Sequence, residues 1–446
     1  MKKTVCVCGL GFVGLTLSVT LAKMGFDVVG VEKNADTARS LQNGQPHFHE
    51  QGLEVALRTY LARGLSIHTH IPRRAIDIFV IAVSTPLNED LQPTLTYLIE
   101  AVQSILPHLK AGALVILRST VPVGTTRSIV LPLLASTGID VRVAFCPERT
   151  IEGKALEELA RLPQIIGGLD TDSVRDASEL FRKVTPVVIE VSSLETAEMI
   201  KLIDNSFRDY MFAFSNDLAM ACSALGVDAS EAIRAANTGY SRNNIPVPGP
   251  VGGICLTKDP RILGWSAGQA GYQLRISSRP IHEAYLNFIV DRCEDAVNQI
   301  GKQLADCKVC ISGLAFKGNP PTDDLRNSPS LDVLQKLRAR MLPSARMYGH
   351  DFVVTDQSIR SLGLIPAQLE ELDGIDLLVI ATNHAQYSRS DMIKVVQGLN
   401  RPAVICDMWR VWDMNLIASL DGIMYLSDSV EVAPTSAMAR MSGVSA

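Results

Sequence analysis

One cysteine of this sequence stands where a thiolate could act as a nucleophile. Cys255 follows the pair Gly252-Gly253, and an acid, Asp259, comes four residues later. If a helix begins here, the side chains of Cys255 and Asp259 share a face, and the amino end of the helix favours a thiolate. Because a thiolate can add to a carbonyl carbon and hold it, the segment indicates covalent catalysis.

A second candidate site is the segment Gly9-Leu10-Gly11-Phe12-Val13-Gly14, which lies between a β-rich apolar run and a helical pattern. Its glycines suit a tight turn, close approach of a pyrophosphate and helix–strand packing, and the amides at the helix start face the anion. The next predicted strand ends in Glu32, which can accept hydrogen bonds from a ribose hydroxyl. The pattern predicts a dinucleotide site. Glu32 would repel a 2′-phosphate and favours NAD over NADP, whereas Lys33 beside it has the opposite effect.

The elements that position these residues form three regions. Strands alternate with helices at both ends of the chain, which predicts parallel, doubly wound sheets with functional loops at their carboxyl ends. Long helical periodicity occupies 195–225 and 280–303, separated by a Gly/Pro-rich stretch at 240–253. The predicted strands are 4–8, 27–31, 78–83, 114–117, 141–145, 308–313, 345–348, 377–381 and 404–406.

We therefore expect an α/β protein in which a helical middle domain joins two Rossmann-like domains. The expected divisions are an NAD-binding domain at 1–193, a helical middle domain carrying Cys255 at 194–303, and a second Rossmann-like domain at 304–432. A small, polar, unpatterned segment at 433–446 is expected to be a flexible tail.

Composition excludes several other classes of protein. The 446 residues include 42 basic and 47 acidic side chains mixed along the chain, so neither a nucleic-acid partner nor a membrane partner is expected. No signal peptide and no bilayer-length apolar run is recognised. Nine scattered cysteines favour free thiols in a reducing cytoplasm over a disulfide framework.

Several further segments carry potential site residues. They are Ser119–Thr125, Cys146–Arg149 with Glu152-Gly153, Ala197–Lys201 with Asn205, Gly313–Lys317 and Asp324–Pro329. Together with the two segments above, they resemble the UDP-glucose/UDP-N-acetylmannosamine 6-dehydrogenase family, in matching order from residue 9 to about 410.

The resemblance implies an NAD-dependent, four-electron oxidation of a UDP-sugar C6 alcohol to a uronic acid by a homodimer. In this reading Cys255 traps the aldehyde as a thiohemiacetal, whose oxidation gives a thioester that water hydrolyses. Lys201 and Asn205, four residues apart on a helix, could direct an ammonium and an amide at the oxyanion. By carry-over from the family, Asp259 and Thr120 could hold a water for proton transfer.

The remaining roles also come from the resemblance. Glu152 is the candidate base for thioester hydrolysis, with Glu148 beside it. Lys317 and Arg326 suit phosphate or carboxylate recognition by their own chemistry, and the resemblance makes their domain, at 304–432, the UDP-sugar-binding domain. The expected cofactor-binding residues are Gly9, Gly11, Phe12, Val13, Gly14, Glu32, Lys33, Thr85, Pro86, Ser119, Thr120 and Arg326. The expected substrate-binding residues are Glu148, Arg149, Glu152, Lys201, Asn205, Gly252, Lys258, Phe316 and Lys317.

Each residue type also has a structural explanation. Lys201 could be solvated and the two glutamates could be surface carboxylates, although Lys201 lies on an otherwise apolar stretch. His47-Phe48-His49-Glu50 lacks a third ligand and matches a substrate-proximal family loop, so no metal site is expected. Cys307-x-x-Cys310 lies in a predicted strand, where the two side chains point to opposite faces. We expect the cysteines other than Cys255 to be small buried hydrophobes.

The sugar is harder to assign. The N-acetylhexosamine branch usually has His, and the glucose branch Ser, at the position of Ile254, while Arg261 and His282 replace a usual aromatic and a common Asn. The segments at 147–159 and 243–253 look like the N-acetylhexosamine branch, so a UDP-N-acetylhexosamine is favoured and UDP-glucose is the alternative. Alternatives of another class are a single-step β-hydroxyacid dehydrogenase and a non-catalytic nucleotide-binding module.

Overall fold

The computed structural model describes residues 2–271 and 278–433. Contacts divide the chain into two compact units, Met1–Ser206 with Lys258–Arg275, and Phe207–Thr257 with Ile276–Ala446. The three-domain division with boundaries at 193 and 303 stays a prediction. The predicted tail lies outside the described residues, except for Ala433.

The first unit contains an eight-stranded sheet in the order β3-β2-β1-β4-β5-β6-β7-β8. Its strands are β1 (Thr4–Cys8), β2 (Asp27–Val31), β3 (Leu65–His68), β4 (Ile78–Ile81), β5 (Leu114–Leu117), β6 (Arg142–Phe145), β7 (Gln164–Gly168) and β8 (Val188–Val191). Every neighbouring pair is parallel except β6 and β7. The sheet is thus mainly parallel, as predicted, with one antiparallel pair. The chain stays at the carboxyl edge after β6, where Gln164 binds Arg118, and so it re-enters the sheet from that edge.

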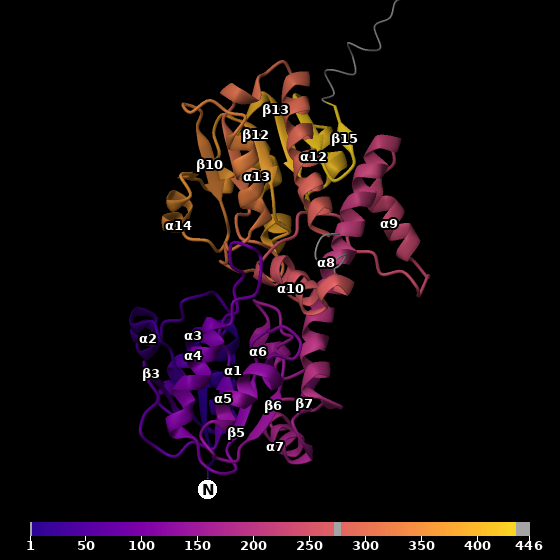
Figure 1. Cartoon of the computed structure of the whole chain (residues 1–446). Helices are drawn as coiled ribbons and strands as arrows, with labels where there is room; N and C mark the ends of the chain where they lie inside the picture. The colour runs from indigo at the N-terminus through magenta and orange to yellow at the C-terminus, as the bar shows by residue number, and fades with distance from the viewer. Residues whose placement is uncertain (1, 272–277, 434–446) are drawn as a thin grey trace, which may run out of the picture. The chain divides into compact units, whose positions relative to one another are not determined.

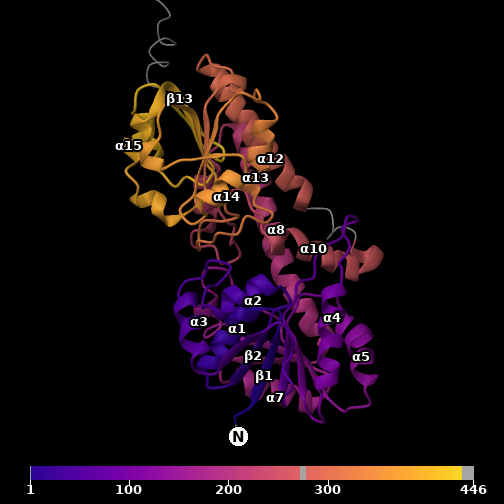
Figure 2. The same cartoon turned by 90° about the vertical axis from the view of Figure 1, so that its left-hand side faces the viewer.

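Helices cover both faces of this sheet (Figure 2). Side chains of α1 (Phe12–Lys23), α2 (Ala35–Gln42), α3 (Leu53–Leu61) and α7 (Thr171–Phe181) pack on one face. Side chains of α4 (Thr96–Ile105) and α5 (Leu131–Ala135) pack on the other face. The short α6 (Ala155–Glu158) follows β6. Because both faces are covered, all five residues of β1 are buried, as its continuous apolar sequence predicts.

The second unit contains a seven-stranded sheet in the order β11-β10-β9-β12-β13-β14-β15. Its strands are β9 (Val309–Ser312), β10 (Met347–His350), β11 (Ile365–Pro366), β12 (Ile375–Ile380), β13 (Leu399–Asp407), β14 (Ile423–Leu426) and β15 (Glu431–Val432). Only β14 and β15 pair antiparallel. The first six strands therefore repeat the 3-2-1-4-5-6 order of the first sheet.

The helices of the second unit also cover both faces of its sheet: Figure 1 shows α12 (Ser278–Gln299) and α13 (Pro329–Arg338), and Figure 2 shows α15 (Met392–Gln397) on the opposite side. One face packs against α12, α13, α14 (Asp356–Ser361), the start of α9 (Ala229–Asn237) and the last turns of α8 (Leu194–Leu225). The other face packs against α15 and α16 (Met414–Ala418). The helix α8 belongs to the first unit through Ser206 and to the second from Phe207 onward, while α10 (Ile254–Ser266) changes unit after Thr257.

The fold class predicted from the sequence is confirmed: two α/β sheets and a helical middle region. Among the helices of the described residues, none combines the length and apolar character that crossing a membrane requires.

Candidate functional site

The glycine-rich turn of the first unit has the backbone geometry that a dinucleotide site needs. Gly9 has a φ of +89°, which an L side chain rarely adopts. A Cβ at Gly14 would overlap the Gly9 carbonyl oxygen, whereas a Cβ at Gly11 would have no heavy atom within 4 Å. The helix α1 begins at Phe12 directly after Gly11, so the space above Gly11 adjoins its amino end. The residues present fit a pyrophosphate held by backbone amides.

The acid at the end of β2 is fixed beside this turn. One carboxylate oxygen of Glu32 accepts from the Leu10 amide at 3.1 Å, and the other accepts from the Asn34 amide at 3.0 Å. Lys33 instead donates to Glu100 at 2.8 Å, and that hydrogen bond and charge raise the pKa of Lys33. Since Glu100 draws the ammonium away, the opposing effect of Lys33 on cofactor choice is reduced.

Two more loops at the carboxyl edge carry predicted cofactor residues. The hydroxyl of Thr85 donates to the Thr120 carbonyl, and that of Ser119 donates to the Val83 carbonyl at 2.7 Å. Pro86 is exposed next to Thr85. The loops after β4 and β5 are thus bound to each other, which brings the predicted residues Thr85, Ser119 and Thr120 together.

Glu198 was not identified from the sequence as a site residue, yet it anchors the loop that contains Thr120. It lies on α8 and is 1% exposed. Its carboxylate accepts from the amides of Gly124 and Thr126, at 2.5 and 2.9 Å, and from the Thr126 hydroxyl. Burial is the largest influence on the pKa of Glu198 and raises it. The only sequence signal was its position three residues before Lys201, on the same helical face.

The loop after β6 is built on a buried ion pair. Arg118 and Glu148, 3% and 5% exposed, are joined at 2.5 Å between Nη2 and Oε2. Burial alone would raise the pKa of Glu148, but Arg118, backbone amides and the more distant charge of Lys201 lower it below its ordinary value. The predicted site residue Glu148 is therefore a charged group whose oxygens are bound by the protein. Arg118, directly after a buried strand, was missed by sequence reasoning.

Other predicted substrate residues lie near this loop. Lys201 is half-buried on α8, so it is not a fully solvated helix residue. Arg149 donates to Asp204 of the same helix at 2.7 Å. Glu152 is half-buried between Ile151 and Gly153.

Asp259 is fully buried and binds two other predicted residues. Its carboxylate accepts from the Asn205 side-chain amide at 2.6 Å and from the Lys258 ammonium at 2.6 Å. The structure thus brings Asn205, Lys258 and Asp259 together. Thr120 instead accepts a hydrogen bond from Thr85 through its carbonyl oxygen. Whether Asp259 and Thr120 share a water stays a prediction.

Cys255 is the second residue of α10 and is exposed, so the predicted helix start is confirmed. The other eight cysteines are buried, as expected, and all nine are free thiols. Burial raises the pKa of Cys146 and Cys310 to about 12, and that of Cys307 to about 11. Only Cys310 lies in β9, because that strand begins after Cys307. Cys255 is therefore the one exposed thiol among the nine cysteines.

The turn before Cys255 is held by the segment that follows β9. The Gly253 amide donates to the Asn327 carbonyl at 2.9 Å, and the Asn327 side chain donates to the Thr257 hydroxyl at 2.9 Å. A Cβ at Gly252 would overlap the Asn327 carbonyl, and one at Gly253 would lie 2.7 Å from the Phe316 ring. Both glycines are thus required by close packing. Asn327, which adopts a φ of +52°, was not predicted as a site residue.

Lys317 and Arg326 extend from the same segment. The Lys317 ammonium lies 5.3 Å from the centre of the Phe316 ring, and Arg326 forms an ion pair with Asp324 at 2.6 Å. Arg326 remains 64% exposed at its side chain and could exchange this partner for an anionic ligand.

A buried network also holds Gly249, which precedes the turn at Gly252-Gly253. Asn216 of α8 donates to the Gly249 carbonyl at 3.0 Å and accepts from the Gly249 amide at 2.8 Å. His282 contacts Asn216 and Asp209, each at 3.3 Å, and is buried. His282, where the family commonly has Asn, thus has a structural place in this network.

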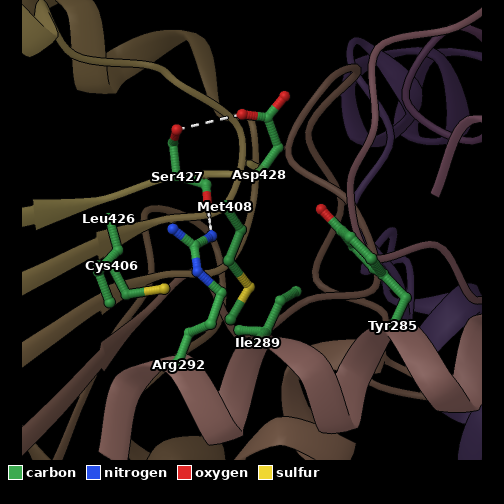
Figure 3. A pocket seen from close by; sticks show the side chains of 8 residues that line it. All are labelled: Tyr285, Ile289, Arg292, Cys406, Met408, Leu426, Ser427 and Asp428. Atoms are coloured by element: carbon green, nitrogen blue, oxygen red, sulfur yellow. Dashed lines mark hydrogen bonds between the residues drawn. The ribbon is translucent and has the colours of Figure 1, made fainter. Parts of the chain in front are cut away.

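The pocket in Figure 3 is a separate feature of the second unit. The Tyr285 hydroxyl is buried without a hydrogen-bond partner among the described residues, and Ser427 binds Asp428 at 3.1 Å. The space is too narrow for a water molecule, so it is no site for a sugar nucleotide. Its lining residues are Tyr285, Ile289, Arg292, Cys406, Met408, Leu426, Ser427 and Asp428. Within 2–271 and 278–433, no group of three or more His, Cys, Asp or Glu side chains is arranged to hold a metal.

The fold and the glycine turn define a dinucleotide-binding α/β protein, and comparison with known proteins gives its family. Three models of the UDP-glucose/GDP-mannose dehydrogenase family match the chain: the NAD binding domain at 3–185, the central domain at 195–282 and the UDP binding domain at 310–414. The chain belongs to this family. It is an NAD-dependent UDP-sugar dehydrogenase, so the predicted enzyme class and cofactor are confirmed.

Relatives match nearly the whole chain. An NDP-N-acetyl-D-galactosaminuronic acid dehydrogenase of Ralstonia nicotianae is 32% identical and covers 94% of this chain and 98% of its own. A UDP-N-acetyl-D-mannosamine dehydrogenase of Escherichia coli is 33% identical, covering 92% and 99%. The solved structure of a UDP-D-ManNAc dehydrogenase from Pyrococcus horikoshii has a TM-score of 0.84 at 30% identity, covering 96% and 100%.

Proposed function

We propose that this enzyme oxidises the C6 alcohol of a UDP-N-acetylhexosamine, of the ManNAc or GlcNAc type, to the uronic acid. One observation carries the chemical part: Cys255 is exposed at the start of α10, whereas the other cysteines are buried. A two-step oxidation must retain the aldehyde, and an exposed thiol at a helix amino end is suited to doing so.

Each step of the proposed reaction has its own residues. Bound NAD supplies the hydride acceptor in both oxidations. Cys255 adds to the aldehyde carbon, Lys201 and Asn205 stabilise the oxyanion, and Glu152 takes a proton from the water that hydrolyses the thioester. For each alcohol, two NAD and one water give one carboxylate, two NADH and three protons. Asp259 and Thr120 hold a water for proton transfer during alcohol oxidation.

The substrate assignment rests on the relatives. Those described above are named for UDP-N-acetylmannosamine and for an NDP-N-acetylgalactosaminuronic acid. A UDP-glucose dehydrogenase from Pyrobaculum islandicum has a similar TM-score of 0.82, at 27% identity, so the shape of the backbone does not separate the sugars. UDP-glucose is therefore the alternative substrate.

The test measures NADH release with UDP-glucose, UDP-GlcNAc, UDP-ManNAc and UDP-GalNAc in parallel. We expect two NADH per sugar with an N-acetylhexosamine, and a loss of kcat of about a thousandfold or more in Cys255→Ser. Cys307→Ser is the matched control, because a serine hydroxyl can keep the bond of this buried thiol to the Gln303 carbonyl. One NADH per sugar, or an active Cys255→Ser enzyme, would overturn the mechanism.

We also propose that the chain forms a homodimer through its helical region. Phe207 and Phe214, seven residues apart on α8, are 61% and 56% exposed. Apolar side chains at this spacing form one stripe, which a second copy would bury. Light scattering at micromolar concentration tests this proposal, and a monomer would contradict it. We place the enzyme in the cytoplasm, because its free thiols suit a reducing compartment.

A further inference from the structure

Glu50 is a buried carboxylate to which the mechanism above gives no role. It ends the segment His47-Phe48-His49-Glu50 between α2 and α3 and is 6% exposed. Burying a carboxylate costs free energy unless hydrogen bonds compensate for the lost water. The partners of Glu50 therefore indicate what it does.

Its partners include two backbone amides from a segment about a hundred residues later in the sequence. The Gly153 amide donates to Oε2 of Glu50 at 2.7 Å, and the Ala155 amide donates to Oε1 at 2.9 Å. Ala155 begins α6, whose N-cap residue Lys154 provides no side-chain cap. Gly153 adopts a φ of +89°. Glu50 thus caps α6 and fixes the backbone immediately after Glu152.

Two other carboxylates fix the backbone before Glu152. Glu148 accepts from the amides of Arg149 and Thr150 at 2.7 and 2.8 Å. Glu158 accepts from the Ile151 amide at 2.8 Å. Glu148 belongs to this loop itself, and Glu158 belongs to α6, so both are local partners. Glu50 is 103 residues from Gly153 in sequence and ties the loop to another part of the first unit.

We propose that Glu50 is a positioning residue for thioester hydrolysis, because it fixes the backbone from which the Glu152 side chain projects and so sets the direction of that side chain. The inference rests on the proposed function of Glu152. In the step concerned, the water oxygen bonds to the thioester carbonyl carbon and a water proton passes to Glu152. The carbon–sulfur bond breaks with its electron pair returning to Cys255 as a thiolate. The carboxylic acid formed releases its remaining proton to solvent, and the product leaves as a carboxylate. Glu50 touches none of the reacting atoms.

The experiment separates this step from the two oxidations. In Glu50→Gln an NH2 group replaces one acceptor oxygen and cannot accept from a backbone amide, so one of the two bonds is lost. Glu50→Asp keeps the charge but is one methylene shorter. Glu54→Gln is the matched control, because Glu54 is 57% exposed at its side chain and pairs only locally with Arg58.

Each variant is mixed rapidly with NAD and the N-acetylhexosamine nucleotide that gives two NADH. We expect the Glu50 variants to release the first two NADH per site at nearly the wild-type rate. Their steady-state kcat should then fall about tenfold to a hundredfold, the cost of a misplaced base. Acid quenching and mass spectrometry should show a covalent adduct on Cys255, while Glu54→Gln behaves like wild type.

Three results would overturn the proposal. They are an unchanged kcat, an equal slowing of the burst and the steady state without an adduct, and failure of both Glu50 variants to fold, which would make Glu50 purely structural. Glu152→Gln tests the proposed function separately. If Glu152→Gln turns over normally, the role of Glu152 fails. If it accumulates the adduct and the folded Glu50 variants do not, only the positioning role fails.

Discussion

The glycine turns of the two sheets are built alike and yet serve different purposes. Gly9 follows β1 and Gly313 follows β9, and both adopt a φ of +89°. A Cβ at Gly9 would lie 2.7 Å from the Ala82 carbonyl after β4, and one at Gly313 would overlap Thr382 after β12. In each sheet, a glycine with positive φ thus follows the first strand and packs closely against the segment that follows the fourth strand.

The acid after the second strand also recurs, but its use differs. Glu32 binds one amide of its glycine turn, that of Leu10, and one amide of its own loop. Asp351 accepts from the amides of Leu314 and Ala315 in the turn, and from those of Val353 and Val354. Half-exposed Glu32 keeps capacity for a ribose, whereas Asp351 is committed to the backbone.

The segments on the carboxyl side of the two turns explain this difference. In the first unit α1 begins at once, so its amino-terminal backbone amides are the groups available to the expected pyrophosphate. In the second unit residues 314–328 precede α13, and this longer segment presents the side chains of Phe316, Lys317 and Arg326. The same strand order can therefore present the amino end of a helix to a phosphate, as in the first unit, or a loop of specific side chains, as in the second.

The largest effect is expected from alanine in the first turn. Gly14→Ala should destabilise the protein by about 3 kcal/mol, because the new Cβ overlaps the Gly9 carbonyl oxygen. Gly11→Ala should leave the thermal midpoint unchanged, since that Cβ has open space, yet weaken NAD binding at least about tenfold by blocking the phosphate. Thermal unfolding and NADH fluorescence titration measure the two effects. Equal stability losses in both variants would contradict the assignment of Gly14 to packing and Gly11 to phosphate binding.

A smaller effect should separate the two acids. Asp351→Asn should cost about 2 kcal/mol of unfolding free energy, because its NH2 group faces amides that need an acceptor. Glu32→Gln should cost about 1 kcal/mol and mainly raise the KM for NAD. Denaturant unfolding and steady-state kinetics measure these changes. If Glu32→Gln proved the more destabilising change, Asp351 would not be the more structural acid.

The sequence predicted the strands, the glycine turns and a helix start better than the side-chain contacts that support them. The strands Thr4–Cys8 and Asp27–Val31 and the helix start before Cys255 were predicted, because local periodicity and glycine spacing determine them. The antiparallel strand β7 was not predicted, and its first residue, Gln164, accepts from Arg118, which lies forty-six residues away in sequence. The roles of Glu50 and Asn327 also depend on long-range pairing, which a single sequence does not reveal.

The smallest effect concerns cofactor choice at the first turn. Glu100→Gln removes the charge that holds Lys33, so the ammonium becomes available to a 2′-phosphate beside Glu32. Because Lys33 is well exposed and screened by water, we expect the ratio of kcat/KM for NADP to that for NAD to rise by no more than about fivefold. Glu370→Gln, which removes an exposed partner of Lys394 in the second unit, is the control. A rise of equal size in the control would mean that general charge, and not Lys33, governs the ratio. No rise in Glu100→Gln would mean that Glu32 alone selects the cofactor, which would sharpen its contrast with Asp351.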